Sequence, residues 1–128
     1  MASIQPSDAA LKELAKAFED FRYIALDASA TAYALSQSAP ITEITTNGGE
    51  RAAATISYDS GTGIVTMSKR FVFSGTAPVK GIVPMNNDTP GLGIALCRYI
   101  PGSGVLPDQF EAGGSLLVTL ECALGRPV

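Results

Sequence analysis

Between residues 50 and 124, apolar and polar residues alternate in short runs that are separated by Gly, Pro, Asn or Asp. Successive side chains of a β-strand point to opposite faces, so this alternation is typical of antiparallel strands with one buried and one hydrated face. Such strands bury their apolar faces against a second layer. The pattern therefore predicts a mainly β fold, either an antiparallel β-sandwich or a jelly-roll-like domain.

The alternation and its interruptions predict roughly seven short strands. The expected ranges are 22–27, 50–59, 64–74, 79–85 and 92–100, followed by a last strand near the C-terminus. Residues 39–44 fit one helical turn or a short edge strand, because Pro40 excludes a central strand. Two apolar rows are expected to face inward: Leu92, Ile94, Leu96 and Ile100 in the fifth range, and Leu116, Val118, Leu120, Cys122 and Leu124 in the last strand.

Residues 7–21 are predicted to form one short amphipathic helix. Leu11, Leu14, Phe18 and Phe21 recur at helical spacing, and Ser7 is a suitable N-cap. A helix of this length is marginal in water by itself, so we expect it to dock on the sheet or on a neighbouring subunit. The predicted organisation is a single domain over 1–128, with an arm at 1–6, the helix at 7–21 and a β-rich body at 22–124.

The chain carries little charge for its size. Charged residues make up 16% of the 128 residues, against about 25% in an average protein, and the net charge is −3. Surface that is poor in charge usually meets another subunit, so a homo-oligomer is expected, with a trimer favoured. Scattered basic residues and a negative net charge argue against nucleic-acid binding. The charged first 22 residues and the lack of any apolar run near 20 residues argue against a secretion signal and a membrane span.

The residues that usually carry catalysis are sparse. The absence of His excludes the common Ser-His-Asp arrangement, and the glycine pairs near 61–63 and 91–93 do not open a helix that could bind phosphate. Asn86, Asn87 and Asp88 fit a turn better than a calcium site. The sequence therefore predicts no enzyme activity, no cofactor and no metal.

Cys97 and Cys122 both fall in predicted strands and belong to no metal-ligand motif. Two buried free thiols are the preferred interpretation, and a cross-strand disulfide is the alternative if the two strands are neighbours in an oxidising compartment.

Several segments resemble a group of small structural proteins of tailed bacteriophages, known as virion or tail-fibre-like proteins. The resemblance rests on residues 21–27, on 41–44 with 50–52, and on the closing run 110–119, and it extends over about 10–124. Asp27 stands where the group usually has Gly, and Gly114 where Asp is common. The group supplies no catalytic residue to carry over.

The resemblance implies a building block of the virion, made in the host cytoplasm. The preferred role is a capsid decoration (cement) protein that contacts the major capsid protein or other virion proteins. A tail or tail-fibre component is the alternative within this class, and a carbohydrate-binding β-sandwich module is the alternative from another class. The candidate interface residues are apolar or aromatic: Leu11, Leu14, Phe18, Phe21, Tyr33 and Phe110.

Overall fold

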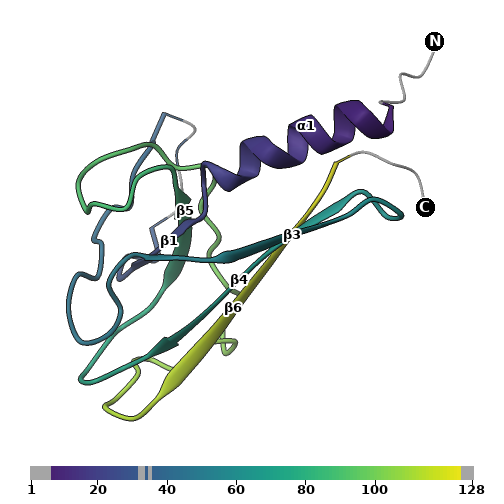
Figure 1. The fold of residues 1–128 in the computed structure, drawn as a ribbon. Coiled ribbons are helices and arrows are strands. Elements are labelled where there is room, and N and C mark those ends of the chain that lie inside the picture. The colour runs from purple at the N-terminus through teal and green to yellow at the C-terminus, as the bar shows by residue number, and fades with distance from the viewer. Residues whose placement is uncertain (1–6, 32–33, 35, 125–128) are drawn as a thin grey trace.

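The computed structural model describes residues 7–31, 34 and 36–124 (Figure 1). This part of the chain is mainly β, with two three-stranded antiparallel sheets and one N-terminal helix, as the sequence predicts. The predicted arm at 1–6 and Tyr33 lie outside the described residues. The small sheet has the order β2 (Ala52–Ala53), β1 (Tyr23–Asp27), β5 (Gly81–Met85), and the long sheet has the order β3 (Thr55–Asp59), β4 (Ile64–Val72), β6 (Ser115–Ala123).

The two sheets differ in the length of their paired strands. In the long sheet, β4 and β6 pair along nine residues, from Ile64↔Ala123 to Val72↔Ser115. In the small sheet, β1 and β5 pair along five, from Tyr23↔Met85 to Asp27↔Gly81. All five residues of β5 are buried, whereas buried and half-exposed residues alternate along much of β4. The small sheet is thus covered on both faces and the long sheet on one.

The predicted strand over 50–59 is divided between the two sheets. β2 pairs with β1, and β3 pairs with β4, so the chain passes from the small sheet to the long sheet at Ala54. The amide of Ala54 donates to the carbonyl of Arg22 at 2.7 Å. The segment around Glu43, for which a helical turn or an edge strand was expected, bridges antiparallel to Asp27 at the end of β1.

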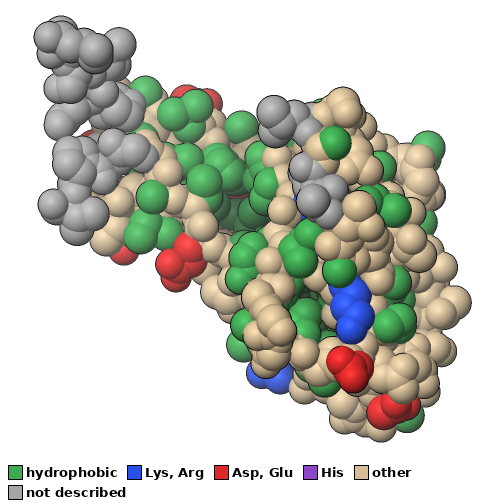
Figure 2. Space-filling model, turned by 180° about the vertical axis from the view of Figure 1, so that it is seen from behind, with side chains coloured by type: hydrophobic (Ala, Val, Ile, Leu, Met, Phe, Trp, Pro, Cys, Tyr) green, Lys and Arg blue, Asp and Glu red, His purple; other side chains and the backbone are tan. Residues whose placement is uncertain are grey.

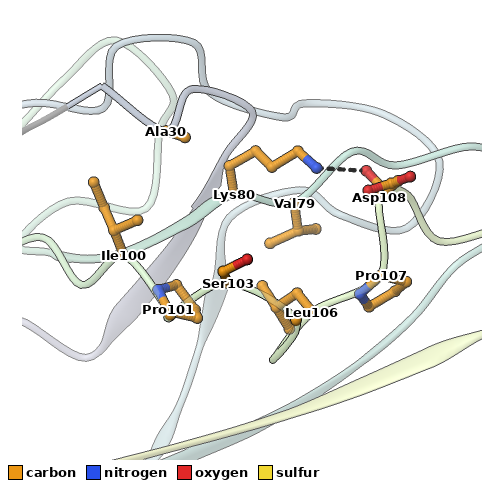
Figure 3. A pocket seen from close by; sticks show the side chains of 11 residues that line it. Ala30, Val79, Lys80, Ile100, Pro101, Ser103, Leu106, Pro107 and Asp108 are labelled. Carbon is orange, nitrogen blue, oxygen red and sulfur yellow. Dashed lines mark hydrogen bonds between the residues drawn. The ribbon is translucent and has the colours of Figure 1, made fainter.

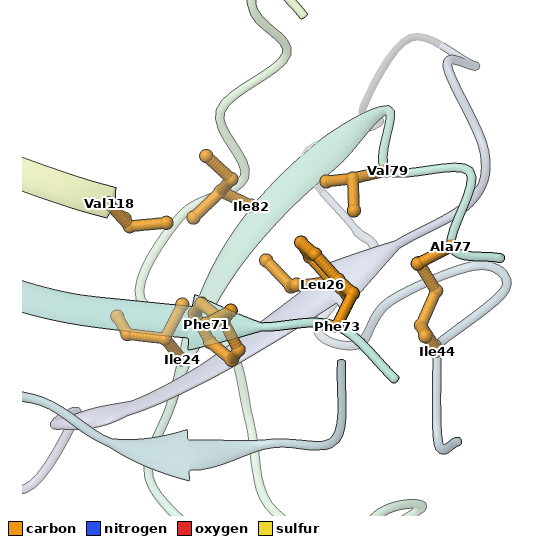
Figure 4. Close-up of a cluster of buried hydrophobic side chains, with 9 residues drawn as sticks. All are labelled: Ile24, Leu26, Ile44, Phe71, Phe73, Ala77, Val79, Ile82 and Val118. Atoms are coloured by element: carbon orange, nitrogen blue, oxygen red, sulfur yellow. The ribbon is translucent and has the colours of Figure 1, made fainter. Parts of the chain in front are cut away.

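One hydrophobic cluster lies between the sheets (Figure 4). Ile24 and Leu26 of β1 point toward Phe71 of β4 and Phe73 just beyond it, and Val118 of β6 lies beside Ile82 of β5. The alternation predicted for these strands places these side chains on the inner faces, as the pairing register confirms. The remaining members are Ile44, Ala77 and Val79.

Helix α1 (Asp8–Glu19) is shorter than the predicted range 7–21. The hydroxyl of Ser7 accepts a hydrogen bond from the amide of Ala10, which confirms the predicted N-cap. Leu11 is fully buried and Ala15 nearly so on the side that meets β3, whereas Leu14 is 50% exposed. The apolar row of the helix is therefore divided between a buried and an exposed side.

We predict that Leu11→Ala lowers the free energy of unfolding by about 2–4 kcal/mol, because it removes a fully buried side chain and leaves a cavity. Leu14→Ala should change it by less than about 1 kcal/mol, since half of that side chain is already in water. Urea denaturation followed by circular dichroism measures both values. Equal losses for the two variants would contradict the observed docking of α1.

Candidate functional site

An open apolar groove of about 370 Å³ lies between α1, the inner face of the long sheet and segment 92–99. Its lining is almost entirely apolar, with one charged residue at its border. Seen from behind, apolar side chains gather along a hollow between the part of the molecule that carries the N-terminal helix and the rest (Figure 2). The lining residues are Phe18, Met67, Pro84, Leu96, Cys97, Tyr99, Leu120, Glu121 and Cys122.

The groove exists because two elements cover the inner face of the long sheet incompletely. The small sheet covers the end of β4 and β6 that holds Phe71 and Val118. Helix α1 covers the β3 side of the other end through Leu11 and Ala15. Between these covers, the inner-facing side chains of Leu120 and Cys122 are only half-buried. The apolar row predicted for β6 thus faces inward, but part of it borders the groove.

Segment 92–99 forms the wall opposite β6, and it is not the regular strand predicted over 92–100. It touches β5 at two isolated bridges, Met85↔Ala95 and Ile82↔Tyr99. Between the two bridges, β5 advances by three residues and the segment by four. The segment thus contains one extra residue, as in a β-bulge. Leu92 and Ile94, predicted to face inward, are 55% and 51% exposed. Their prediction was wrong. Both residues precede the bulge, and Ala95 packs against the buried Val83 and Met85, so its neighbour Ile94 points away from them.

A buried arginine anchors the beginning of this wall. The guanidinium of Arg51 donates to both carboxylate oxygens of Glu43, at 2.9 and 2.6 Å. Its Nη1 donates to the backbone carbonyls of Asn87 and Leu92, at 2.8 and 2.9 Å. The Arg51 side chain is 1% exposed, and these four bonds compensate the cost of its burial. The loop from 87 to 92 is therefore fixed to the edge of the small sheet.

Asp27, at the end of β1, organises the segment that follows it. One carboxylate oxygen accepts hydrogen bonds from the amides of Ser29 and Thr42, both at 2.9 Å. The other accepts from the amide of Ile41 at 2.8 Å. The side chain is completely buried. A glycine at this position could not make these contacts.

A second buried arginine anchors the end of the wall on Asp27. The Nε of Arg98 lies 3.2 Å from Asp27 Oδ2 as an ion pair without hydrogen-bond geometry. Its two terminal nitrogens donate to the carbonyls of Ser29 and Thr31. Both partners of this ion pair are fully buried, so each needs the charge of the other. Segment 92–99 is thus held at both ends by arginines.

We predict that Asp27→Asn lowers the free energy of unfolding by about 3–5 kcal/mol, because it leaves the charge of Arg98 buried without a counter-ion. The exposed Asp20→Asn removes the same charge and should cost less than about 0.5 kcal/mol. Urea denaturation compares the two variants. A loss below about 1 kcal/mol for Asp27→Asn would show that the ion pair does not hold the segment.

Cys97 and Cys122 border the same groove from opposite walls. Both are free thiols, as the preferred interpretation predicts, but Cys97 is exposed and Cys122 is half-buried, so the predicted burial was wrong. Burial against the groove raises the pKa of the Cys97 thiol above its ordinary value, and the nearby Cys122 adds to the rise. The thiolate is the reactive form, so Cys97 reacts slowly near neutral pH.

We predict that Cys97, as the single thiol in a Cys122→Ser variant, is alkylated by iodoacetamide with a pH midpoint above the value of about 8.5 for a free cysteine. A raised pKa keeps the thiol protonated to higher pH, so the rate should increase later along the pH axis. Mass spectrometry after timed quenching measures the rate. A midpoint at or below that of free cysteine would contradict the partial desolvation of the Cys97 thiol at the groove wall.

The structure separates the predicted interface residues. Phe18 lines the groove, and Leu14 is exposed one turn earlier on the helix. Leu11 belongs to the buried side of the helix, and Phe21 is half-buried. Phe110 stacks on Phe73 with ring centroids 4.7 Å apart, near the other end of β4. These residues therefore do not form one surface.

A second, smaller cavity of about 230 Å³ lies beside the loop at 101–108 (Figure 3). The ammonium group of Lys80 crosses it and donates to the backbone carbonyl of Asp108 at 2.8 Å. Val79 and Leu106 supply apolar lining. Because Lys80 already holds the loop, this cavity is best explained as part of the loop's attachment to the body.

The polar residues of the loop at 86–91 serve its own backbone. Asn87 Oδ1 accepts from the amide of Thr89 at 2.8 Å, and Asn86 Oδ1 accepts from the amide of Ile94 at 2.7 Å. These bonds confirm the predicted turn.

Within the ranges 7–31, 34 and 36–124, no group of three or more His, Cys, Asp or Glu side chains is placed to hold a metal ion. In the same ranges, no helix has the length and apolar character that a membrane span requires.

Comparisons with known proteins provide no relative for this chain: no protein-family model matches it, and neither a curated protein nor a solved structure gives a significant match.

Proposed function

We propose that this chain is a structural protein of a tailed-bacteriophage virion and acts as a capsid decoration protein. The sequence resemblance over 10–124 supports the class, and the open apolar groove carries the choice of a binding role. A surface of this kind binds another macromolecule more readily than it supports acid–base chemistry, since Glu121 is the only charged residue among the described residues that line it. In this proposal the partner is the major capsid protein or another protein of the shell.

The exposed apolar surface gives the proposal its physical basis. Burying it releases about 25 cal/mol per Å², and this gain must exceed the cost of association, which is about 4–15 kcal/mol. Several copies that each cover a junction between capsid subunits would add such gains over the whole shell. Of the large apolar side chains exposed in the described residues, Leu96 and Tyr99 line the groove and form the contact that we propose. The others lie outside the groove: Leu14, Ile41, Val72, Leu92, Ile94, Val105 and Leu117.

For the architecture we propose a short β-sandwich. The cluster of Leu26, Phe71 and Ile82 belongs to both sheets, as in two layers packed face to face. A jelly roll has eight strands in two Greek keys, more than the six that the described residues form. On the shell, we expect the chain to act as a homo-oligomer, for which a trimer matches a junction of threefold symmetry.

The proposal predicts that the protein co-sediments at a fixed ratio with purified, expanded heads of the phage that encodes it. Tyr99→Asp should weaken this binding by at least about tenfold, because it places a charge in an apolar contact. Tyr99 is 49% exposed, so the variant should fold normally. Quantitative sedimentation with circular dichroism of each variant measures both properties.

Val105→Asp is the matched control, since Val105 is 65% exposed and lies outside the groove. It should bind heads as the unmodified protein does. Purified tails provide the comparison for a tail or tail-fibre role. Binding to tails and not to heads would replace the capsid proposal, and binding to neither would reject a virion role.

A further inference from the structure

The outer edge of β6 offers an unpaired row of backbone groups. Phe73 exchanges backbone bonds with Gly113 and Gly114, and the amide of Leu124 donates to Gly63, so the pairs at both ends of the β4–β6 ladder are hydrogen-bonded. Hydrogen-bonded pairs alternate along an antiparallel ladder. The even-numbered residues of β6 therefore bond to β4. The odd-numbered residues direct their N–H and C=O groups away from β4: Ser115, Leu117, Thr119, Glu121 and Ala123.

Nothing within the described part of the chain blocks this edge. No described strand or isolated bridge pairs with the outer side of β6. Proteins usually protect such edges with Lys, Pro, a bulge or a very short strand. β6 has nine residues, contains neither Lys nor Pro, and keeps one register with β4 from end to end. This edge thus has the properties of a strand that accepts another strand.

The apolar groove extends to the same edge. It is lined by the inward-facing Leu120 and Cys122 and by Glu121 between them, and β6 is the edge strand of the long sheet. Leu96 and Tyr99 form the facing wall. A strand added to β6 would therefore direct alternate side chains into the groove.

We propose that β6 and the apolar groove together bind an extended peptide segment of another protein by antiparallel strand addition. Main-chain hydrogen bonds to the odd-numbered residues of β6 would supply affinity, and apolar side chains at every second position would enter the groove. The volume of about 370 Å³ is at the low end for binding pockets and suits a few side chains of one segment. Glu121 favours a basic residue in the segment.

Strand addition to β6 rests on the proposed function only because both take the groove as the contact surface. The peptide experiment is independent of it, since no capsid is present. If strand addition fails, sedimentation with heads still decides whether the protein decorates them. If head binding fails, the peptide experiment still decides whether β6 accepts a strand.

The probe is a capped nine-residue peptide of alternating valine and threonine with lysine at each end, titrated by fluorescence anisotropy. Residues opposite each other in a hydrogen-bonded pair share a face, so the threonines should lie over the outer face and bond to Leu117, Thr119 and Glu121. The valines should enter the groove. We expect measurable binding below about 1 mM, with lower affinity for a Tyr99→Ala variant and no change for Val105→Ala.

Two methylated peptides with identical side chains provide the sharpest control. Methylation of the threonine amides should weaken binding by at least about tenfold, because those amides donate to β6. Methylation of the valine amides should change it little, because those amides point away from β6. Hydrogen exchange by NMR should show new protection at Leu117, Thr119 and Glu121, while Val118 and Leu120 are protected with or without peptide.

Absence of binding at about 1 mM would overturn the proposal, as would equal effects of the two methylation patterns. Light scattering of the protein alone measures its oligomeric state and provides a further test. A stable dimer in which Leu117, Thr119 and Glu121 are already protected would identify a second copy of this chain as the occupant of the edge and would also overturn it.

Discussion

The unequal length of the two sheets determines most of the remaining structure. At about 3.3 Å per residue, the five-residue strands of the small sheet extend for about 17 Å, whereas the nine-residue strands of the long sheet extend for about 30 Å. The small sheet therefore cannot cover the inner face of the long sheet. Helix α1 covers part of what is left, and the remainder is the apolar groove. The groove follows from strand length and not from any single residue.

Buried charge replaces regular pairing on the outer side of the small sheet. Segment 92–99 pairs with β5 only at two isolated bridges, with backbone hydrogen bonds to Ile82 and Pro84, and it does not form a continuous strand. Arg51 and Arg98 also hold its ends, each with a carboxylate and with backbone carbonyls. Buried ion pairs contribute little net stability, but the loss of one partner is costly. Their role here is to specify where an irregular segment lies.

The sequence predicted those features that depend on local pattern. The helix cap at Ser7, the inward row of β6 and the turn near 86–91 follow from spacing and residue type. At the Asn47-Gly48 turn both residues have positive φ, and a Cβ on Gly48 would lie 2.1 Å from the carbonyl oxygen of Val72. This close approach explains why glycine is needed there.

The features that the sequence could not predict depend on distant partners. Asp27 and Arg98 are 71 positions apart, and no local pattern indicates that they meet (98 − 27 = 71). The alternation at 92–100 predicted a buried strand, because pattern alone does not show that a bulge interrupts the pairing with β5. The groove was missed for the same reason: its walls come from α1, β4, β5, β6 and segment 92–99. In sequence these apolar residues cannot be distinguished from core.

The rigid attachment of segment 92–99 has a consequence for binding. Its apolar side chains are exposed, so the buried arginines at its ends stabilise a wall and not a core. Ordering a loop during association costs free energy, and a wall that is already fixed avoids this cost. The same holds for β6, whose even-numbered residues are bonded to β4 before any partner arrives. Both sides of the groove are therefore preorganised, and apolar burial in it can contribute more fully to affinity.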